Sequence, residues 1–188
     1  MRLEIVKKFL STDECTMLNQ WVENGIKDNL FDLGFGLTDS LSKRATTRRS
    51  GGRFKYPDEI IAISNKIREY VGVSDCPLVE GGHGRDGIVV SCTFEGGNVF
   101  KHFDPPVHPT LSTLRCNVMT QKPVDGGVLH IDGKPIDLEA GDLHCYLASE
   151  HEHHVDQVVG KTPRILWMFG ALVDKKSWDN NVIKFGDM

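Results

Sequence analysis

The apolar and polar positions in residues 1–72 predict two amphipathic helices. Ser11 and Glu14 have the spacing of a capping box, in which each side chain accepts a hydrogen bond from the other residue's backbone. The apolar residues that follow are spaced as on one helix face: Leu18, Trp21, Val22 and Ile26. A second helix is expected to begin near Pro57 and to end at Gly72, with an isoleucine-rich apolar side between them.

The pattern changes between residues 87 and 173. Short apolar and β-branched runs alternate there with Gly, Pro and Asp turns, which is typical of strands. The tail, residues 174–188, is short and polar, with Trp178 and Phe185 as expected anchors. A length of 188 residues suits one domain with a sizeable core. We therefore predict a single domain, 1–188, made of a helical N-terminal part, a mainly β core and a tail.

Composition narrows the classes of partner and compartment. The formal net charge is −4, so the chain lacks the overall basic character of nucleic-acid-binding proteins, and a nucleic-acid partner is not favoured. No apolar run is long enough to cross a bilayer, and the N-terminus lacks the apolar stretch of a signal peptide. The five cysteines are dispersed and odd in number, which indicates reduced, buried thiols. We expect a cytoplasmic protein without a membrane partner.

His102 and Asp104, separated by one residue, form the first candidate site. Residues 100–104 are typical of an extended strand, in which positions i and i+2 point to the same face. Both side chains can then face one metal ion, while Phe103 is expected to point the other way into packing. Imidazole and carboxylate ligands suit a divalent transition metal that keeps open positions for substrate and oxygen.

A histidine-rich segment further along the chain supplies candidates for a third ligand: His151, His153 and His154. Residues 160–163 are typical of a turn. Arg164 then opens an apolar run that extends to Val173. A charged residue at the start of a buried strand is costly unless it meets an anion, and a planar guanidinium matches a carboxylate in bidentate fashion.

Taken together, these residues resemble the Fe(II)/2-oxoglutarate-dependent oxygenases, and most of all their small prolyl-4-hydroxylase-like members. The resemblance covers roughly residues 87–173 and is carried by an ordered set of motifs. In chain order the set is Thr93-Phe94-Glu95-Gly96-Gly97, His102-x-Asp104, Gly126-Gly127, Ala140-Gly141-Asp142-Leu143, His153-x-Val155-x-x-Val158 and Arg164. The His-x-Asp motif alone is a weak signal, whereas the complete ordered set is a strong one.

The resemblance implies a fold, a metal and a cosubstrate. The implied fold is a mainly β double-stranded β-helix of the jelly-roll type, with the N-terminal helices packed on it. His102, Asp104 and His153 become the ligands of Fe(II), and Arg164 holds the distal carboxylate of 2-oxoglutarate. Lys161 is a minor rival for that role. His153 is preferred over its neighbours because Val155 shares its face. Ascorbate is implied as a stimulant.

Two more polar residues lie on a predicted core strand, namely Arg115 and Asn117. If they face inward, they bind substrate or the 2-oxoglutarate carboxylates, and if they face outward they are surface groups. The remaining histidines are interpreted as packed or exposed residues without a metal: His83, His108, His130 and His144.

Residues 42–55 are strongly basic within an acidic protein. Their glycines and small polar residues predict a loop. Two interpretations stand: a solvated surface loop, or a lid that recognises an acidic or extended substrate and closes over the iron.

The implied activity is hydroxylation of a C–H bond in a peptide prolyl residue, a free amino acid or a small metabolite, with release of succinate and CO2. The carboxylate of Asp104 favours hydroxylation, because halogenating relatives carry a small residue there. A demethylase of alkylated nucleic acids has the same three ligands, but such relatives carry a second arginine soon after the first, and residues 165–173 contain none. A non-catalytic, metal-binding cupin-like domain is the other alternative, and it would not need Arg164.

Overall fold

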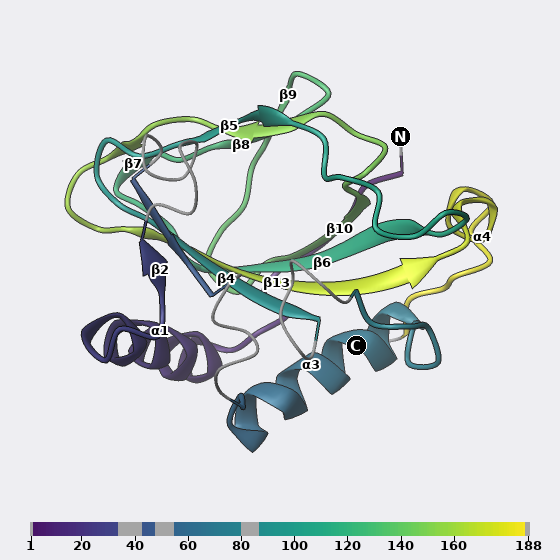
Figure 1. The fold of residues 1–188 in the computed structure, drawn as a ribbon, viewed down its shortest axis with the longest axis horizontal. Helices are drawn as coiled ribbons and strands as arrows, with labels where there is room; N and C mark the ends of the chain where they lie inside the picture. Colours follow the sequence, from purple (N-terminus) through teal and green to yellow (C-terminus); the bar gives the residue numbers. More distant parts are fainter. Residues whose placement is uncertain (1, 34–42, 48–54, 80–86, 187–188) are drawn as a thin grey trace.

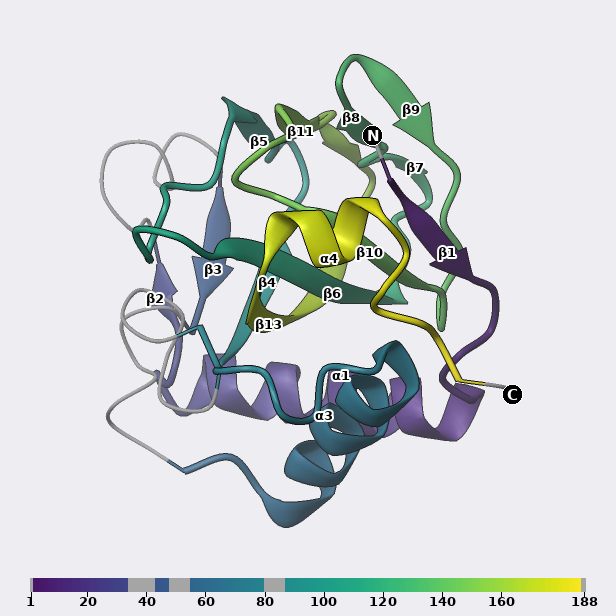
Figure 2. The same ribbon diagram turned by 90° about the vertical axis from the view of Figure 1, so that its right-hand side faces the viewer.

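The protein is described as a computed structural model, covering residues 2–33, 43–47, 55–79 and 87–186. Its architecture has three layers: a small sheet, a large sheet and a pair of helices against the outer face of the large sheet (Figures 1 and 2). This is the predicted jelly-roll core with N-terminal helices packed on it. None of the helices in these ranges is long and apolar enough to cross a membrane.

The large sheet has seven strands in the order β1-β10-β6-β13-β4-β3-β2. The small sheet has the order β5-β11-β8-β9, and β12 pairs with β7 in a two-stranded ribbon. The strands, in chain order, are β1 (Glu4–Val6), β2 (Asp32–Leu33), β3 (Arg44–Thr46), β4 (Ile88–Thr93), β5 (Val99–His102), β6 (Ser112–Gln121), β7 (Asp125–Gly126), β8 (Leu129–Ile131), β9 (Lys134–Ile136), β10 (Leu143–Leu147), β11 (His153–Val155), β12 (Val158–Val159) and β13 (Arg164–Val173).

The two predicted helices are confirmed as α1 (Thr12–Lys27) and α3 (Asp58–Val71). Both hydrogen bonds of the capping box between Ser11 and Glu14 are present at the start of α1. Helix α3 follows Pro57 and ends at Gly72, whose φ of +77° is the left-handed conformation that favours glycine at a helix end.

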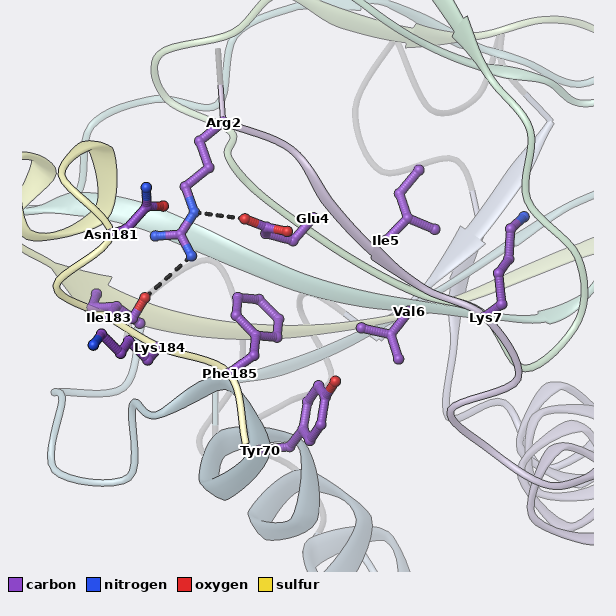
Figure 3. Close-up of a pocket in the computed structure, with 10 residues that line it drawn as sticks. All are labelled: Arg2, Glu4, Ile5, Val6, Lys7, Tyr70, Asn181, Ile183, Lys184 and Phe185. Atoms are coloured by element: carbon purple, nitrogen blue, oxygen red, sulfur yellow. Dashed lines mark hydrogen bonds and ion pairs between the residues drawn. The ribbon is translucent and has the colours of Figure 1, made fainter. Parts of the chain in front are cut away.

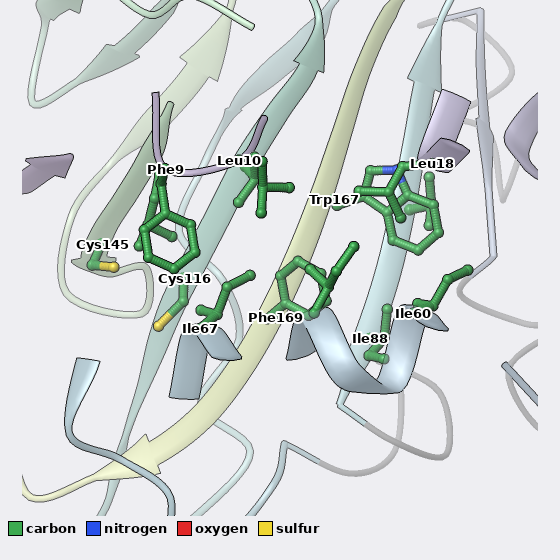
Figure 4. Close-up of a cluster of buried hydrophobic side chains, with 14 of the residues drawn as sticks. Phe9, Leu10, Leu18, Ile60, Ile67, Ile88, Cys116, Cys145, Trp167 and Phe169 are labelled. Atoms are coloured by element: carbon green, nitrogen blue, oxygen red, sulfur yellow. The ribbon is translucent and has the colours of Figure 1, made fainter. Parts of the chain in front are cut away.

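The main core lies between the helices and the large sheet (Figure 4). Trp167 and Phe169 of β13 meet Leu18 of α1 and Ile60 and Ile67 of α3 in this layer. All five side chains are buried. Burying aliphatic and aromatic side chains of this size contributes about 1.5–3 kcal/mol each, so the helices are held to the sheet mainly by this apolar layer.

The tail contains a short helix, α4 (Lys175–Asp179), where the sequence predicted only a polar segment. The anchor Trp178 is confirmed as fully buried. Arg2 joins this tail to the first strand (Figure 3): its guanidinium donates to the carbonyl oxygens of Trp178 and Ile183 at 2.7 and 3.1 Å. The same group lies 4.1 Å from the centre of the Trp178 ring.

The predicted basic loop 42–55 is only partly a loop. Arg44–Thr46 forms strand β3, which pairs with β4 in the large sheet. Ala45 and Thr46 are buried there, so the small residues that suggested flexibility serve instead to pack an edge region of the sheet. Residues 42 and 48–54 of this range lie outside the described residues, and the lid interpretation stays a prediction.

Candidate metal and anion site

Strand alternation in the large sheet separates the core from a polar cavity. On β6, Leu114, Cys116 and Val118 belong to the helix-facing core, whereas Arg115 and Asn117 line a cavity of about 50 Å³ on the other face. The two other central strands follow the same rule. Their cavity-lining members are His144 and Tyr146 of β10 and Arg164, Leu166 and Met168 of β13.

The three predicted metal ligands come together at this cavity. His102 at the end of β5 is the register partner of His153 at the start of β11. Asp104 lies just beyond β5, where its backbone N–H donates to Ala148 O at 3.0 Å. Asp104 Oδ1 is 3.6 Å from His102 Nε2 and 3.9 Å from His153 Nε2. One ligand atom from each of the three residues lies within 4.8 Å of the others.

Hydrogen bonds fix the orientation of both imidazole rings. His102 Nδ1 donates to Phe100 O at 2.7 Å, and His153 Nδ1 donates to His151 O at 2.9 Å. Because a carbonyl oxygen only accepts, Nδ1 carries the proton in each ring, and the Nε2 lone pair is left to bind a cation. Burial lowers the pKa of His153 to about 4, so this ring is neutral at physiological pH. The donor set therefore fits a divalent transition metal with two nitrogens and one oxygen.

Arg115 orients the carboxylate of this set. Its Nε and Nη2 both donate to Asp104 Oδ2, at 2.8 and 2.6 Å, while Oδ1 faces the two histidines. Burial alone would raise the pKa of Asp104, but the charge of Arg115, with His102 and His153, holds that pKa well below its usual range. Arg115 thus faces inward, one of the two predicted orientations, and its guanidinium contacts the candidate metal ligand Asp104.

A second buried guanidinium, that of Arg164, lines the cavity at the start of β13, six residues from Gly170, the register partner of Arg115. Its Nε donates to Gly127 O at 3.1 Å, and its Nη2 has no hydrogen-bond partner within the described residues. Burial lowers the pKa of Arg164 to about 10, and the charge of Arg44 acts in the same direction, so the group stays protonated at neutral pH. Gly127 has a φ of +64°, and a Cβ there would lie 3.3 Å from Arg164 Cδ. The glycine therefore lets the arginine lie against the backbone.

The polar groups of the cavity wall are only partly paired with one another. Asn117 Nδ2 lies 3.3 Å from His144 Nε2. Three further buried atoms without a hydrogen-bond partner in the described residues line the same cavity: Ser91 Oγ, Asn117 Oδ1 and His144 Nδ1. Buried polar groups are nearly always paired, so these atoms are candidate contacts for a polar ligand. The positive charge of Arg164 beside them would favour an anion.

Sequence reasoning missed three side chains of this wall: Arg44, His144 and Tyr146. Arg44 lies in the range that was predicted to be a loop, so its position could not be inferred. Tyr146 and His144 alternate on a strand with core residues, and this spacing was an available signal. Burial, followed by the charge of Arg164, lowers the pKa of His144 to about 3, and this ring is therefore neutral.

The expectation for Phe103 is wrong. The chain leaves strand β5 after His102, and the Phe103 side chain is 54% exposed instead of packed. The physical reason for the difference is that the outer face of the small sheet is not covered by any helix in the described part of the chain (Figure 1).

The rival residues lie away from the three ligands. His151 Nδ1 is 2.8 Å from Asp132 Oδ2, and His154 stacks on His130 on the outer face of the small sheet. Lys161 is exposed in the turn before β13 and does not line the cavity. Only His153 of the three clustered histidines therefore faces His102 and Asp104.

Comparison with known proteins gives a consistent result for the fold. No protein-family profile matches the chain, and no curated protein matches it significantly. Solved structures do. A Pseudomonas putida prolyl-4-hydroxylase matches with a TM-score of 0.64 and 16% identity, over 92% of both chains. A Trichoplax adhaerens prolyl hydroxylase, in complex with a hypoxia-inducible-factor peptide fragment, matches with a TM-score of 0.67 and 16% identity, over 95% of this chain and 86% of that one.

A third neighbour carries out a different reaction. The non-heme α-ketoglutarate-dependent carbocyclase SnoK from nogalamycin biosynthesis matches with a TM-score of 0.68 and 12% identity, over 98% of this chain and 87% of that one. The neighbours thus share the fold, while their names describe different reactions, prolyl hydroxylation and carbocycle formation. The resemblance predicted from the sequence is confirmed at the level of the fold: the chain has the jelly-roll architecture of the Fe(II)/2-oxoglutarate-dependent oxygenases, of the prolyl-4-hydroxylase-like type.

Proposed function

We propose that the protein is an Fe(II)- and 2-oxoglutarate-dependent dioxygenase that hydroxylates a C–H bond. The observation that carries this proposal is a single cavity lined both by His102, Asp104 and His153 and by the buried cation Arg164. Two imidazoles and one carboxylate with open positions are the ligand set of non-heme Fe(II) oxygenases. A dicarboxylate that reaches from the metal to Arg164 would bind both at once.

Each polar residue of the wall has a distinct part in this scheme. His102, His153 and Asp104 would hold the ion, and Arg115 keeps Asp104 turned so that only Oδ1 faces it. Arg164 would pair with the distal carboxylate of 2-oxoglutarate through the Nη2 that has no other described partner. When bound, Fe(II) and 2-oxoglutarate would supply the chemistry that activates O2: one oxygen atom would enter the succinate that forms with release of CO2, and the other would enter the substrate.

The apolar part of the cavity wall would exclude water from the site. Val155, Leu129 and Leu166 line the cavity together with the polar groups and are largely buried. Excluding water strengthens the electrostatic hold of Arg164 on an anion and protects reactive species from side reactions. With a volume of about 50 Å³ the cavity must widen to admit a five-carbon diacid, so we expect cosubstrate binding to move side chains such as Met168 or Leu166.

The substrate class is proposed more broadly. A peptide prolyl residue, a free amino acid and a small metabolite all fit, and the Trichoplax neighbour was solved with a peptide. Phe100 and Phe103 are exposed next to His102 in the sequence, and an apolar part of a substrate would find contacts there. Ascorbate is expected to stimulate turnover by keeping the iron reduced.

The test is succinate formation by the purified protein supplied with Fe(II), 2-oxoglutarate, ascorbate and oxygen, together with candidate substrates. Prolyl peptides, free amino acids and small metabolites would be screened by mass spectrometry for the gain of one oxygen atom. The His102→Ala variant serves as the matched inactive control. Succinate that appears only with the wild type supports the proposal. Metal binding without any response to 2-oxoglutarate would favour a non-catalytic cupin-like domain, and oxidation of an alkylated oligonucleotide would favour the demethylase alternative.

A further inference from the structure

A second group of metal-ligating side chains lies on the outer face of the small sheet: His130, His154 and Asp156. It is separate from the site described above, because neighbouring residues of a strand point to opposite faces. His153 of β11 faces the cavity, so His154 faces outward. His130 of β8 is the direct register partner of His154.

The geometry of this outer cluster brings three potential ligand atoms together. The two imidazole rings are stacked, with centroids 4.5 Å apart and planes 12° from parallel. His130 Nε2 lies 2.8 Å from Asp156 Oδ2, and His154 Nε2 lies 3.9 Å from Asp156 Oδ1. Each imidazole thus has its Nε2 directed at one oxygen of the same carboxylate.

The backbone holds these three residues rigidly enough to serve as a site. His130 and His154 sit on paired strands, so their separation is set by the sheet. Asp156 follows β11 directly, and its backbone N–H donates to Val128 O at 3.0 Å, which ties it to the start of β8. A hydrogen bond from His130 accounts for only one carboxylate oxygen. The imidazole of His154 makes no hydrogen bond within the described residues, and a cation between the three side chains would engage all of them.

We propose that His130, His154 and Asp156 form a second metal site, which binds a divalent transition ion of the zinc type. Two imidazoles and one carboxylate suit zinc, cobalt, nickel or copper, whereas magnesium and calcium prefer an all-oxygen set. The three side chains are partly exposed, which leaves water to complete the coordination. A bound ion would add a cross-link between β8 and β11, which are already paired in the small sheet. Strand β11 also carries His153.

The first test removes the inner site so that only the outer one is counted. In a His102→Ala/Asp104→Ala parent, titration with Zn(II) against a chromophoric chelator should show one ion per chain. Adding His154→Ala should weaken Zn(II) binding by more than about 100-fold, since loss of even an outer-shell partner of a metal costs roughly 10–100-fold. His151→Ala in the same parent is the matched control, because this neighbouring imidazole pairs with Asp132 and lies outside the cluster. Unchanged Zn(II) affinity after His154→Ala would overturn the proposal.

The second test needs no variant and therefore does not depend on how the parent folds. Crystals of the wild-type protein grown with Zn(II) should show an anomalous peak between His130, His154 and Asp156, and excess Mg(II) should not displace it. Crystals that show a peak at the inner site but none at the outer one would refute the assignment, whatever the activity of the protein proves to be.

Discussion

Replacing Arg164 by leucine should weaken binding of 2-oxoglutarate, the proposed cosubstrate, without affecting binding of the proposed metal. The arginine is fully buried, and its Nη2 has no partner among the described residues, so a carboxylate placed against it would form a desolvated charge pair. Losing one partner of such a pair costs on the order of 2–5 kcal/mol, which is roughly a 30-fold to several-thousand-fold loss of 2-oxoglutarate affinity. Fe(II) affinity should hardly change, because Arg164 does not contact the three proposed ligands.

Arg164→Lys should lie between the wild type and Arg164→Leu. Lysine retains the charge but cannot form the planar fork or keep the Nε hydrogen bond to Gly127 O. Lys161→Met is the matched control, since Lys161 is exposed in the adjacent turn and does not line the cavity.

The assay is an anaerobic titration of the Fe(II) protein with 2-oxoglutarate, followed by the weak metal-to-ligand absorption band. A full set of affinities for the wild type, both Arg164 variants and the control distinguishes charge from geometry. Unchanged affinity in Arg164→Leu would refute the pairing, and a loss confined to Lys161→Met would move the role to that residue.

Three further predictions concern the third candidate ligand, the orientation of Asp104 and the stability of the fold. His153→Ala should abolish Fe(II) binding at the inner site, measured by equilibrium dialysis in a His130→Ala background that removes the proposed outer site. His151→Ala in the same background should retain it, and the reverse result would mean that the register of β11 is displaced. Arg115→Met should weaken Fe(II) binding by about 10–100-fold, because the carboxylate of Asp104 loses the donors that orient it. Arg115→Lys should bind Fe(II) more tightly than Arg115→Met but less tightly than the wild type. Equal Fe(II) affinity in the wild type and both variants would argue against this orienting role. Asp142→Asn should lower the free energy of urea unfolding at pH 7 by about 1.5–3 kcal/mol. This difference between variant and wild type should shrink below about pH 4. A difference that persists at low pH would contradict a lowered pKa of Asp142 in the folded state.

The sign of the Asp142 effect follows from its contacts. Burial alone would raise the pKa of this carboxyl, but hydrogen bonds from the backbone N–H of Glu139 and Lys8 and from the Lys7 side chain hold the pKa below its usual value. A lowered pKa in the folded state means that the stabilisation is present above the unfolded pKa and is lost as the pH falls through the folded one.

Elements with strong local signals could be predicted from the sequence. The capping box at Ser11 and the glycine at Gly72 mark helix ends through local hydrogen bonding and backbone conformation, which do not depend on the rest of the chain. The start of β13 at Arg164 was likewise predicted, because a turn precedes it and an apolar run follows.

Features that depend on contacts between distant segments could not be predicted. Strand β3 is three residues long and exists because β4 lies beside it, so a basic, glycine-containing sequence gave no sign of it. The inward orientation of Arg115 was left open by strand alternation alone, and its pairing with Asp104 requires β6 to lie under the end of β5. The exposure of Phe103 depends on which face of the small sheet lacks a covering helix.

The central position of β13 has a consequence for the order of folding. This strand is the last one along the described residues, yet it lies between β6 and β4 in the large sheet. Strands β4 and β6 cannot pair with β13 until β13 has been synthesised. At roughly 5–20 residues per second, the interval between synthesis of β4 and of β13 lasts on the order of 10 s. During this time β4 and β6 expose unpaired edges that can pair with other chains. From this topology we expect a slow, aggregation-sensitive folding step that insertion of β13 completes, and we expect Arg164 to enter the cavity at that step.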